Sequence, residues 1–163
     1  MTLISMETDG PKPGYRPCVG IFLLNAERQV FVGQRFDAPG EAWQMPQGGI
    51  DPGEDPIAAG RREMEEEIGT GQARLLQPSR VWRSYDLPKD IAQRMWGGRY
   101  LGQTQLWVAY AFTGQDGDIR LDVPHPEFKA WRWAEPAHLA TLVVPFKRDV
   151  YLSVAAEFRP LWA

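Results

Sequence analysis

The chain has 163 residues, of which 44% are hydrophobic and 24% charged, and it carries a net charge of −3. This composition is typical of a single soluble domain that is long enough to bury a sizeable core. The small negative charge excludes a general attraction for DNA or RNA, so any RNA contact requires a local basic patch.

The cysteine content and the hydropathy pattern restrict the compartment. Cys18 is the only cysteine, which excludes an intramolecular disulfide and favours a reducing compartment. The longest apolar run, Val19 to Leu24, is too short for a membrane span, and the acidic N-terminus lacks the basic head of a signal peptide. His125 and His138 are too few and too scattered to suggest zinc. We therefore expect a cytoplasmic protein with no membrane partner, as a monomer or a weak homodimer.

The elements predicted along the chain favour an α/β architecture. Residues 1–13 are polar and predict a flexible leader, followed by one domain over residues 14–163. Residues 18–24 and 30–35 are dense in β-formers and predict a hairpin, and further strands are expected at 80–85, 104–112 and 128–133. An amphipathic helix started by Pro145 is expected over residues 146–158. Strands interleaved with helices predict a mixed sheet covered on both faces.

The strongest local prediction is a short helix after residue 55. Asp55 can cap its free amide groups, Pro56 suits the first helical position, and Gly69 suits the end. Apolar residues recur at spacings of seven and four and give one stripe that faces the core; they are Ile57, Met64 and Ile68.

Three glutamates near the end of this helix are the first indication of function. Glu63, Glu66 and Glu67 stand at i, i+3 and i+4, so their charges repel one another and also the negative end of the helix dipole. A divalent cation compensates this charge, and carboxylate ligands select Mg²⁺ or Mn²⁺ over zinc. A solvated acidic face, neutralised by Arg61 and Arg62, is an equally good explanation of the triplet alone.

The surrounding residues form a much more specific pattern. Gly48, five residues, Glu54, seven residues and then the run from Arg62 to Thr70 resembles the signature of the Nudix hydrolases, G-x5-E-x7-R-E-U-x-E-E-x-G-U, with U an aliphatic residue. Every fixed position matches, and Thr70 replaces one aliphatic residue where only packing is expected to change. The resemblance implies an α/β/α sandwich and metal-dependent hydrolysis of a phosphoric anhydride.

The resemblance also assigns roles to residues. It implies metal ligands at Glu63, Glu66 and Glu67, with the carbonyl of Gly48 facing the metal and Arg62 orienting a glutamate. The general base is expected among Glu54, Glu67 and Glu127, with the choice left open. Glu127 lies in a segment, residues 125–133, that resembles the P-E-F-x-x-W-R-W stretch of bacterial RNA pyrophosphohydrolases, which implies a metal ligand or a base there.

Other segments concern the substrate. Residues 14–17, 43–49, 85–88, 102–105 and 146–151 resemble the Nudix branch that contains RNA pyrophosphohydrolase and asymmetrical dinucleoside tetraphosphate hydrolase. Cationic side chains can bind phosphates, aromatic rings can stack on a base, and an amide can read a base edge. The expected substrate-binding residues are Arg16, Arg35, Tyr85, Gln103, Phe146 and Lys147. For the aromatic residues, core packing is the alternative.

Three functions remain open at this point. The first is a Mg²⁺- or Mn²⁺-dependent hydrolase that removes pyrophosphate from the 5′ end of triphosphorylated RNA in mRNA decay, with bis(5′-nucleosyl) tetraphosphates as the alternative substrate. The second is a Nudix protein that senses a nucleotide without hydrolysing it. The third is a Nudix enzyme for a nucleotide sugar or a damaged nucleotide. The intact acidic positions favour catalysis over sensing.

Overall fold

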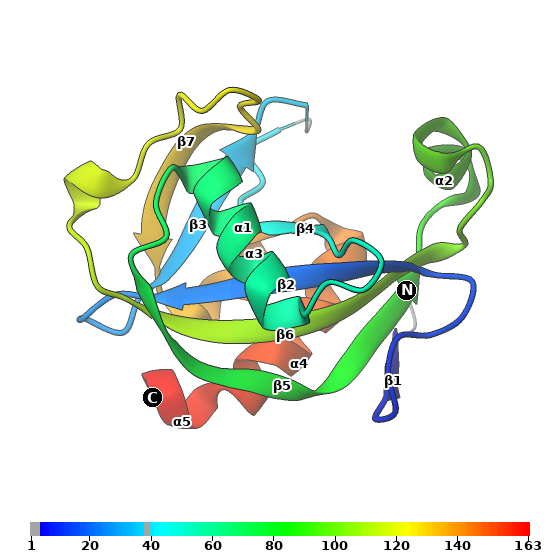
Figure 1. Cartoon of the computed structure of the whole chain (residues 1–163), viewed down its shortest axis with the longest axis horizontal. Coiled ribbons are helices and arrows are strands. Elements are labelled where there is room, and N and C mark those ends of the chain that lie inside the picture. The colour runs from blue at the N-terminus through cyan, green and yellow to red at the C-terminus, as the bar shows by residue number, and fades with distance from the viewer. Residues whose placement is uncertain (1–3, 38–39) are drawn as a thin grey trace.

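A computed structural model describes residues 4–37 and 40–163. Within these ranges, seven strands form one mixed sheet in the order β1-β5-β6-β2-β3-β7, and β4 pairs with β2 outside this path (Figure 1). The strands are β1 (Ile4–Glu7), β2 (Arg16–Leu24), β3 (Val30–Arg35), β4 (Gln47–Gly49), β5 (Ala73–Asp86), β6 (Gly102–Phe112) and β7 (Phe128–Ala134). The helices are α1 (Pro56–Ile68), α2 (Lys89–Trp96), α3 (Leu139–Leu142), α4 (Arg148–Glu157) and α5 (Arg159–Trp162).

The central strand β2 divides the core into two layers. It pairs in parallel with β6 and antiparallel with β3, and alternate side chains point to opposite faces. On one face Val19, Ile21 and Leu23 pack with α1, and on the other Phe22 and Leu24 pack with α4. Figure 1 shows α1 over one face of the sheet and α4 over the other. The prediction of an α/β/α sandwich with a mixed sheet is therefore confirmed.

Helix α1 begins and ends where its local signals indicate. The Asp55 carboxylate accepts a hydrogen bond from the backbone N–H of Ala58 at 3.1 Å, and Pro56 occupies the first turn. Gly69 ends the helix in the left-handed conformation with a φ of 74°, which glycine adopts without a steric cost. Met64 and Ile68 are fully buried. This packing fixes which face of α1 turns toward the sheet and therefore where its glutamates point.

The structure differs from the sequence-based expectation in several elements, and β4, α3 and α5 were among those not predicted. Residues 1–3 of the expected leader lie outside the described ranges, but Ile4–Glu7 form β1, which pairs with β5. Strand β5 is longer than expected because irregular pairing accommodates Pro78. Helix α2 was not predicted. The closing helix begins as a 3-10 turn, Pro145–Lys147, before α4.

In the part of the chain that the structure describes, no helix is long and apolar enough to cross a membrane.

Candidate active site

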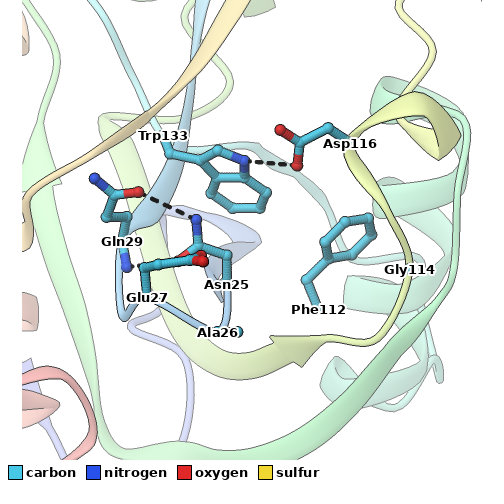
Figure 2. A pocket seen from close by; sticks show the side chains of 8 residues that line it. All are labelled: Asn25, Ala26, Glu27, Gln29, Phe112, Gly114, Asp116 and Trp133. Atoms are coloured by element: carbon cyan, nitrogen blue, oxygen red, sulfur yellow. Dashed lines mark hydrogen bonds between the residues drawn. The ribbon is translucent and has the colours of Figure 1, made fainter.

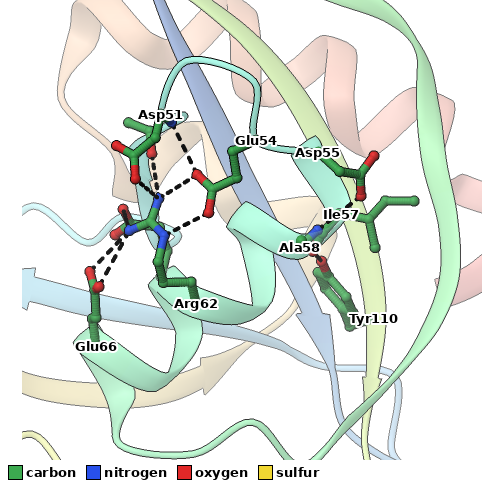
Figure 3. Close-up of polar contacts among 10 residues, drawn as sticks. Asp51, Glu54, Asp55, Ile57, Ala58, Arg62, Glu66 and Tyr110 are labelled. Atoms are coloured by element: carbon green, nitrogen blue, oxygen red, sulfur yellow. Dashed lines mark hydrogen bonds and ion pairs between the residues drawn. The ribbon is translucent and has the colours of Figure 1, made fainter.

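Arg62 connects the acidic residues at the centre of the site. Its Nε and Nη2 atoms donate to both oxygens of Glu54, at 2.8 and 2.9 Å. The same guanidinium donates to the backbone carbonyl of Gly49 at 2.9 Å, to Glu63 at 2.9 Å and to Glu66 at 3.3 Å. Figure 3 shows Arg62 between Glu54 and Glu66, with Asp51 alongside. One planar cation thereby joins α1 to the loop after β4, a geometry that lysine does not reproduce.

Glu54, which forms the two-point ion pair with Arg62, is a poor proton acceptor. Hydrogen bonds from Arg62 and from the backbone of Asp51 lower the pKa of Glu54 to about 2. A carboxylate that is so strongly stabilised as an anion has little tendency to take a proton from water. This geometry favours Glu54 as a group that orients Arg62 rather than as a general base.

Glu63 and Glu67 point into the protein from one face of α1. Their exposed fractions are 8% and 3%, and burial raises the pKa of both carboxyls. At Glu67 the negative charges of Glu127 and Glu63 raise the pKa further. Gly48 lies so close to Glu63 that a methyl group in its place would collide with the carboxylate. Strand β4 therefore needs glycine here because its backbone approaches the acidic face directly.

Glu127 reaches this cluster from the segment before β7. The end of β3 holds that segment in place, since the N–H of Phe36 donates to the Glu127 carbonyl at 3.1 Å. The Glu127 carboxylate accepts a hydrogen bond from Arg35 at 3.4 Å and remains 40% exposed. The structure thus brings Glu127 close to Glu63 and Glu67 of α1, although Glu127 is distant from them in the sequence.

Glu66 lies apart from the other three. Its side chain is 57% exposed and pairs with Arg62 one turn earlier on α1. Among the described residues, no three acidic, histidine or cysteine side chains are already gathered tightly enough to enclose a metal ion. Glu66 therefore lies at the exposed edge of the cluster, with Arg62 between it and Glu54 (Figure 3).

The chemistry of the buried carboxylates fits a divalent cation. Within the described chain, the Oε2 atom of Glu67 is buried without a hydrogen-bond partner. An unpaired buried anionic oxygen is costly, and neighbouring carboxylates increase the cost. Hard oxygen ligands of this kind suit Mg²⁺ or Mn²⁺. The expected ligand set therefore has a physical reason to bind a cation, and Glu67 supplies the clearest one.

The residues expected to contact a base are largely buried. The hydroxyl of Tyr85 donates to Gln103 at 2.9 Å, and Gln47 and Gln105 donate to the same amide oxygen at 3.0 and 2.8 Å. Tyr85 is 2% exposed and packs against Phe146, which differs from the expectation of an open stacking face. Tyr85 and Gln103 are therefore part of the buried interior, and Phe146 is the more accessible ring.

The three cations expected to bind phosphates lie around the acidic cluster and differ in their contacts and burial. Arg16 packs across Gly49 and donates to the sulfur of Cys18 at 3.7 Å. Arg35 forms a two-point ion pair with Asp37, at 2.7 and 2.8 Å, so it is already partly neutralised. Burial, reinforced by the charge of Arg35, lowers the pKa of Lys147 to about 8.

Two residues that contact these cations, Gln44 and Asp37, were not among the predicted site residues. Gln44 is 8% exposed, its Nε2 atom has no partner within the described chain, and its Oε1 atom accepts a hydrogen bond from Lys147 at 3.5 Å. Its place in the 43–49 segment was the available signal. Asp37 was not identified because nothing in the sequence around it marks an ion pair with Arg35.

A surface hollow of about 350 Å³ lies at the other end of the sheet (Figure 2). It is lined by the turn after β2, the end of β6 and Trp133, whose indole N–H donates to Asp116 at 3.0 Å. The charged groups in its lining are Glu27 and Asp116, which repel a polyphosphate. It contains none of the expected site residues, so we place the candidate active site at α1 and β4.

Comparisons with known proteins agree with the Nudix signature that runs from Gly48 to Thr70. The NUDIX domain matches residues 14–154. An RNA pyrophosphohydrolase of Rhodospirillum rubrum is 60% identical over 143 residues, which cover 88% of this chain and 86% of that protein. An RNA pyrophosphohydrolase of Roseobacter denitrificans is 50% identical over 146 residues, which cover 88% of this chain and 91% of that protein.

A solved structure shares the fold. The E. coli dihydroneopterin triphosphate pyrophosphohydrolase aligns with a TM-score of 0.63 at 19% identity, over 87% of this chain and 97% of that one. At this identity the likeness concerns the fold alone. The domain match, the two sequence relatives and the shared sandwich lead to one conclusion: the chain belongs to the NUDIX family.

Proposed function

We propose that this protein is a divalent-metal-dependent hydrolase that releases pyrophosphate from the 5′ end of triphosphorylated RNA. The observation that carries the chemistry is the Oε2 atom of Glu67, which is buried without a hydrogen-bond partner among the described residues and faces the charges of Glu63 and Glu127. The choice of RNA is supported by the 60% identity to the Rhodospirillum rubrum RNA pyrophosphohydrolase. Mg²⁺ or Mn²⁺ is the proposed cofactor because the available ligands are carboxylates.

The proposed cation ligands are Glu63, Glu67 and the carbonyl of Gly48, with Glu66 as a further ligand at the exposed edge of the cluster; of the two roles open to Glu127, we propose that of general base. A cation held by these residues would supply charge neutralisation for the phosphates and a position for the attacking water. Arg62 holds the loop after β4 against α1, which keeps Gly48 beside Glu63. Phosphoryl transfer depends mainly on such positioning and on electrostatic stabilisation.

The general base is proposed to be Glu127. Both oxygens of Glu54 accept hydrogen bonds from Arg62, and Glu67 is almost completely buried. Glu127 is 40% exposed and reaches the edge of the acidic cluster, so water can approach it. It would accept the proton of the attacking water while Arg35 stabilises the phosphate oxygens. Arg35 would exchange Asp37 for the substrate in this step.

The substrate is proposed to lie with its phosphates toward α1 and its first nucleoside toward Phe146. Arg16 and Lys147 flank this path and supply positive charge. Phe146 is half-buried next to Tyr85 and supplies a flat face for a base. The buried amides of Gln103 and Gln105 and the half-buried amide of Gln47 form mutual hydrogen bonds that hold the protein surface beneath this path rigid.

The test is a comparison of two substrates with the same protein. 5′-triphosphorylated RNA and diadenosine tetraphosphate are incubated separately with Mg²⁺ or Mn²⁺, and the products are separated by chromatography. We expect pyrophosphate and 5′-monophosphorylated RNA, formed with the higher kcat/KM. A higher kcat/KM for the dinucleotide would reverse the substrate assignment, and binding of both without turnover would support a sensor instead.

A further inference from the structure

The chain between β5 and β6 forms an excursion beside the candidate active site. We define the β5–β6 excursion as residues 87–101, which include α2. Strands β5 and β6 pair Asp86 with Gly102 and Tyr85 with Gln103, so the excursion leaves and rejoins the sheet next to two of the expected substrate residues. Figure 1 shows α2 standing away from the sandwich beyond the ends of these strands.

The base of the excursion is fixed to the sheet. The N–H of Leu87 donates to the carbonyl of Leu101, and the N–H of Leu101 donates to that of Gly14, both at 3.1 Å. The hydroxyl of Tyr15 donates to Asp86 at 2.5 Å. Ile91 and Trp96 pack against the same apolar cluster that contains Tyr85 and contacts Phe146. The outer face of α2 therefore has a defined position relative to the site.

The excursion is basic in a protein that is acidic as a whole. It contains Lys89, Arg94 and Arg99 against the single acid Asp90, while the chain carries a net charge of −3. All four of these side chains are exposed. Lys12, on the segment that the excursion touches through Gly14, adds a further cation. Arg94 lies 3.7 Å from Asp90, and the exposed Asp86 stands at the base of the excursion, so this surface keeps a modest net positive charge. A local basic patch of this kind is what contact with RNA requires in an acidic protein.

Aromatic rings are interleaved with these cations. The rings of Trp96 and Tyr100 meet edge to face at 5.7 Å, and the guanidinium of Arg99 lies 5.1 Å from the centre of Tyr100. Gly97 and Gly98 adopt left-handed conformations and turn the chain back, so that the N–H of Arg99 donates to the Trp96 carbonyl. Trp96 and Tyr100 are both half-buried, which leaves part of each ring accessible.

We propose that the β5–β6 excursion binds the single-stranded RNA chain that follows the reacting 5′ end. Cations that track phosphates and rings on which bases stack are the two requirements for binding a single strand without sequence preference. The excursion supplies both next to Tyr85 and Gln103. This inference rests on the proposed RNA substrate. It implies that RNA longer than a few nucleotides binds more tightly than a dinucleoside polyphosphate, which has no chain to reach α2.

The test compares two double variants. One removes two charges from the excursion, and the control removes two charges from β5, outside the excursion. The variant is Arg94→Gln with Arg99→Gln, both at exposed positions, and the matched control is Arg74→Gln with Arg80→Gln, which are exposed on β5 before its final stretch of pairing with β6. Binding of 3′-labelled, 5′-triphosphorylated RNA of about twelve nucleotides is measured by fluorescence anisotropy in EDTA and compared with a triphosphorylated dinucleotide.

We expect the excursion variant to bind the longer RNA about tenfold more weakly and the dinucleotide almost unchanged. The slope of log affinity against log salt concentration is expected to fall by about 0.7 for each phosphate that the variant no longer neutralises. The control variant is expected to leave both affinities unchanged. Equal losses of affinity for both RNAs, or equal losses in variant and control, would overturn the proposal.

A second readout separates this proposal from the proposed function. With Mg²⁺ present, the excursion variant is expected to raise KM for the longer RNA and to keep kcat, and to leave hydrolysis of diadenosine tetraphosphate unchanged. If the unmodified protein hydrolyses no RNA of any length, the proposed function fails, and the binding in EDTA still decides the role of the excursion. If RNA is hydrolysed and its length does not affect binding, only the excursion proposal fails.

Discussion

Arg62 and Glu54 form a two-point ion pair, with N–O distances of 2.8 and 2.9 Å, between α1 and the loop that follows β4. The two residues are eight positions apart in the sequence, and their ion pair closes this loop over the acidic face of the helix. Because Arg62 also donates to Gly49 and Glu63, it couples the position of the β4 backbone to that of a proposed metal ligand.

Arg62→Lys is expected to lower kcat by about 10- to 100-fold, as is usual when a group that orients a metal ligand is removed. The ammonium group keeps the charge but cannot hold Glu54, Glu63 and Gly49 at once. Steady-state kinetics with triphosphorylated RNA provides the measurement. Arg61→Lys is the control, since Arg61 donates to the Ala73 carbonyl on β5 instead. Similar losses of activity in the two variants would contradict an orienting role for Arg62.

Glu67→Gln is expected to abolish metal-dependent hydrolysis and to stabilise the metal-free protein by an amount on the order of 1 kcal/mol. The variant removes a buried charge that faces Glu63 and Glu127. Thermal unfolding in EDTA measures the gain. Mg²⁺ is expected to raise the melting temperature of the unmodified protein and not that of the variant. A variant that is less stable in EDTA would show that Glu67 is not a strained carboxylate.

The raised pKa of Glu67 also predicts how the stability of the metal-free protein depends on pH. Burial and the neighbouring charges raise the pKa of Glu67 in the folded protein, so the folded state holds this proton more strongly than the unfolded state. Its contribution to stability is complete below the pKa of the unfolded state and is lost as the pH rises through the folded pKa. In EDTA, the difference in unfolding free energy between Glu67→Gln and the unmodified protein is therefore expected to grow with pH over this range. A constant difference would contradict the raised pKa.

The lowered pKa of Lys147 predicts that substrate binding depends on pH. Its pKa is lowered to about 8, so the ammonium is charged below this pH and neutral above it. If Lys147 binds a phosphate, KM rises as the pH increases through 8. Lys147→Arg keeps its charge and is expected to flatten this rise, whereas Lys147→Met is expected to raise KM at all pH values. A rise that persists unchanged in the arginine variant would assign the titration to another group.

Gly48→Ala is expected to lower kcat at least tenfold, because the added methyl group collides with the Glu63 carboxylate and displaces either that ligand or β4. Gly117→Ala is the control, since a methyl group there meets open space. Activity and melting temperature are measured for both variants. An active alanine variant at position 48 would show that the β4 backbone is not required close to the metal ligands.

Helix α1 and its glutamates were predictable because their determinants are local. Asp55, Pro56 and Gly69 act on neighbouring backbone groups, and the apolar stripe of the helix needs only the regular spacing of its residues. The two strands of the first hairpin were predictable for the same reason. Helix α2 was not, because its start lacks a side-chain cap and its eight residues include only a short apolar stripe that packs on residues distant in sequence.

Local signals in the sequence were enough to predict the acidic helix, the positions of most of the main strands along the chain and the family that the chain resembles. The tertiary structure alone decided which glutamates face inward, since the packing of Met64 and Ile68 buries Glu63 and Glu67 and leaves Glu66 with Arg62. It also decided that Glu127 approaches Glu67, that Tyr85 is buried, and that Asp37 forms an ion pair with Arg35. These relationships join residues through the sheet, and burial and Coulomb interactions depend on distance in space rather than on separation along the chain.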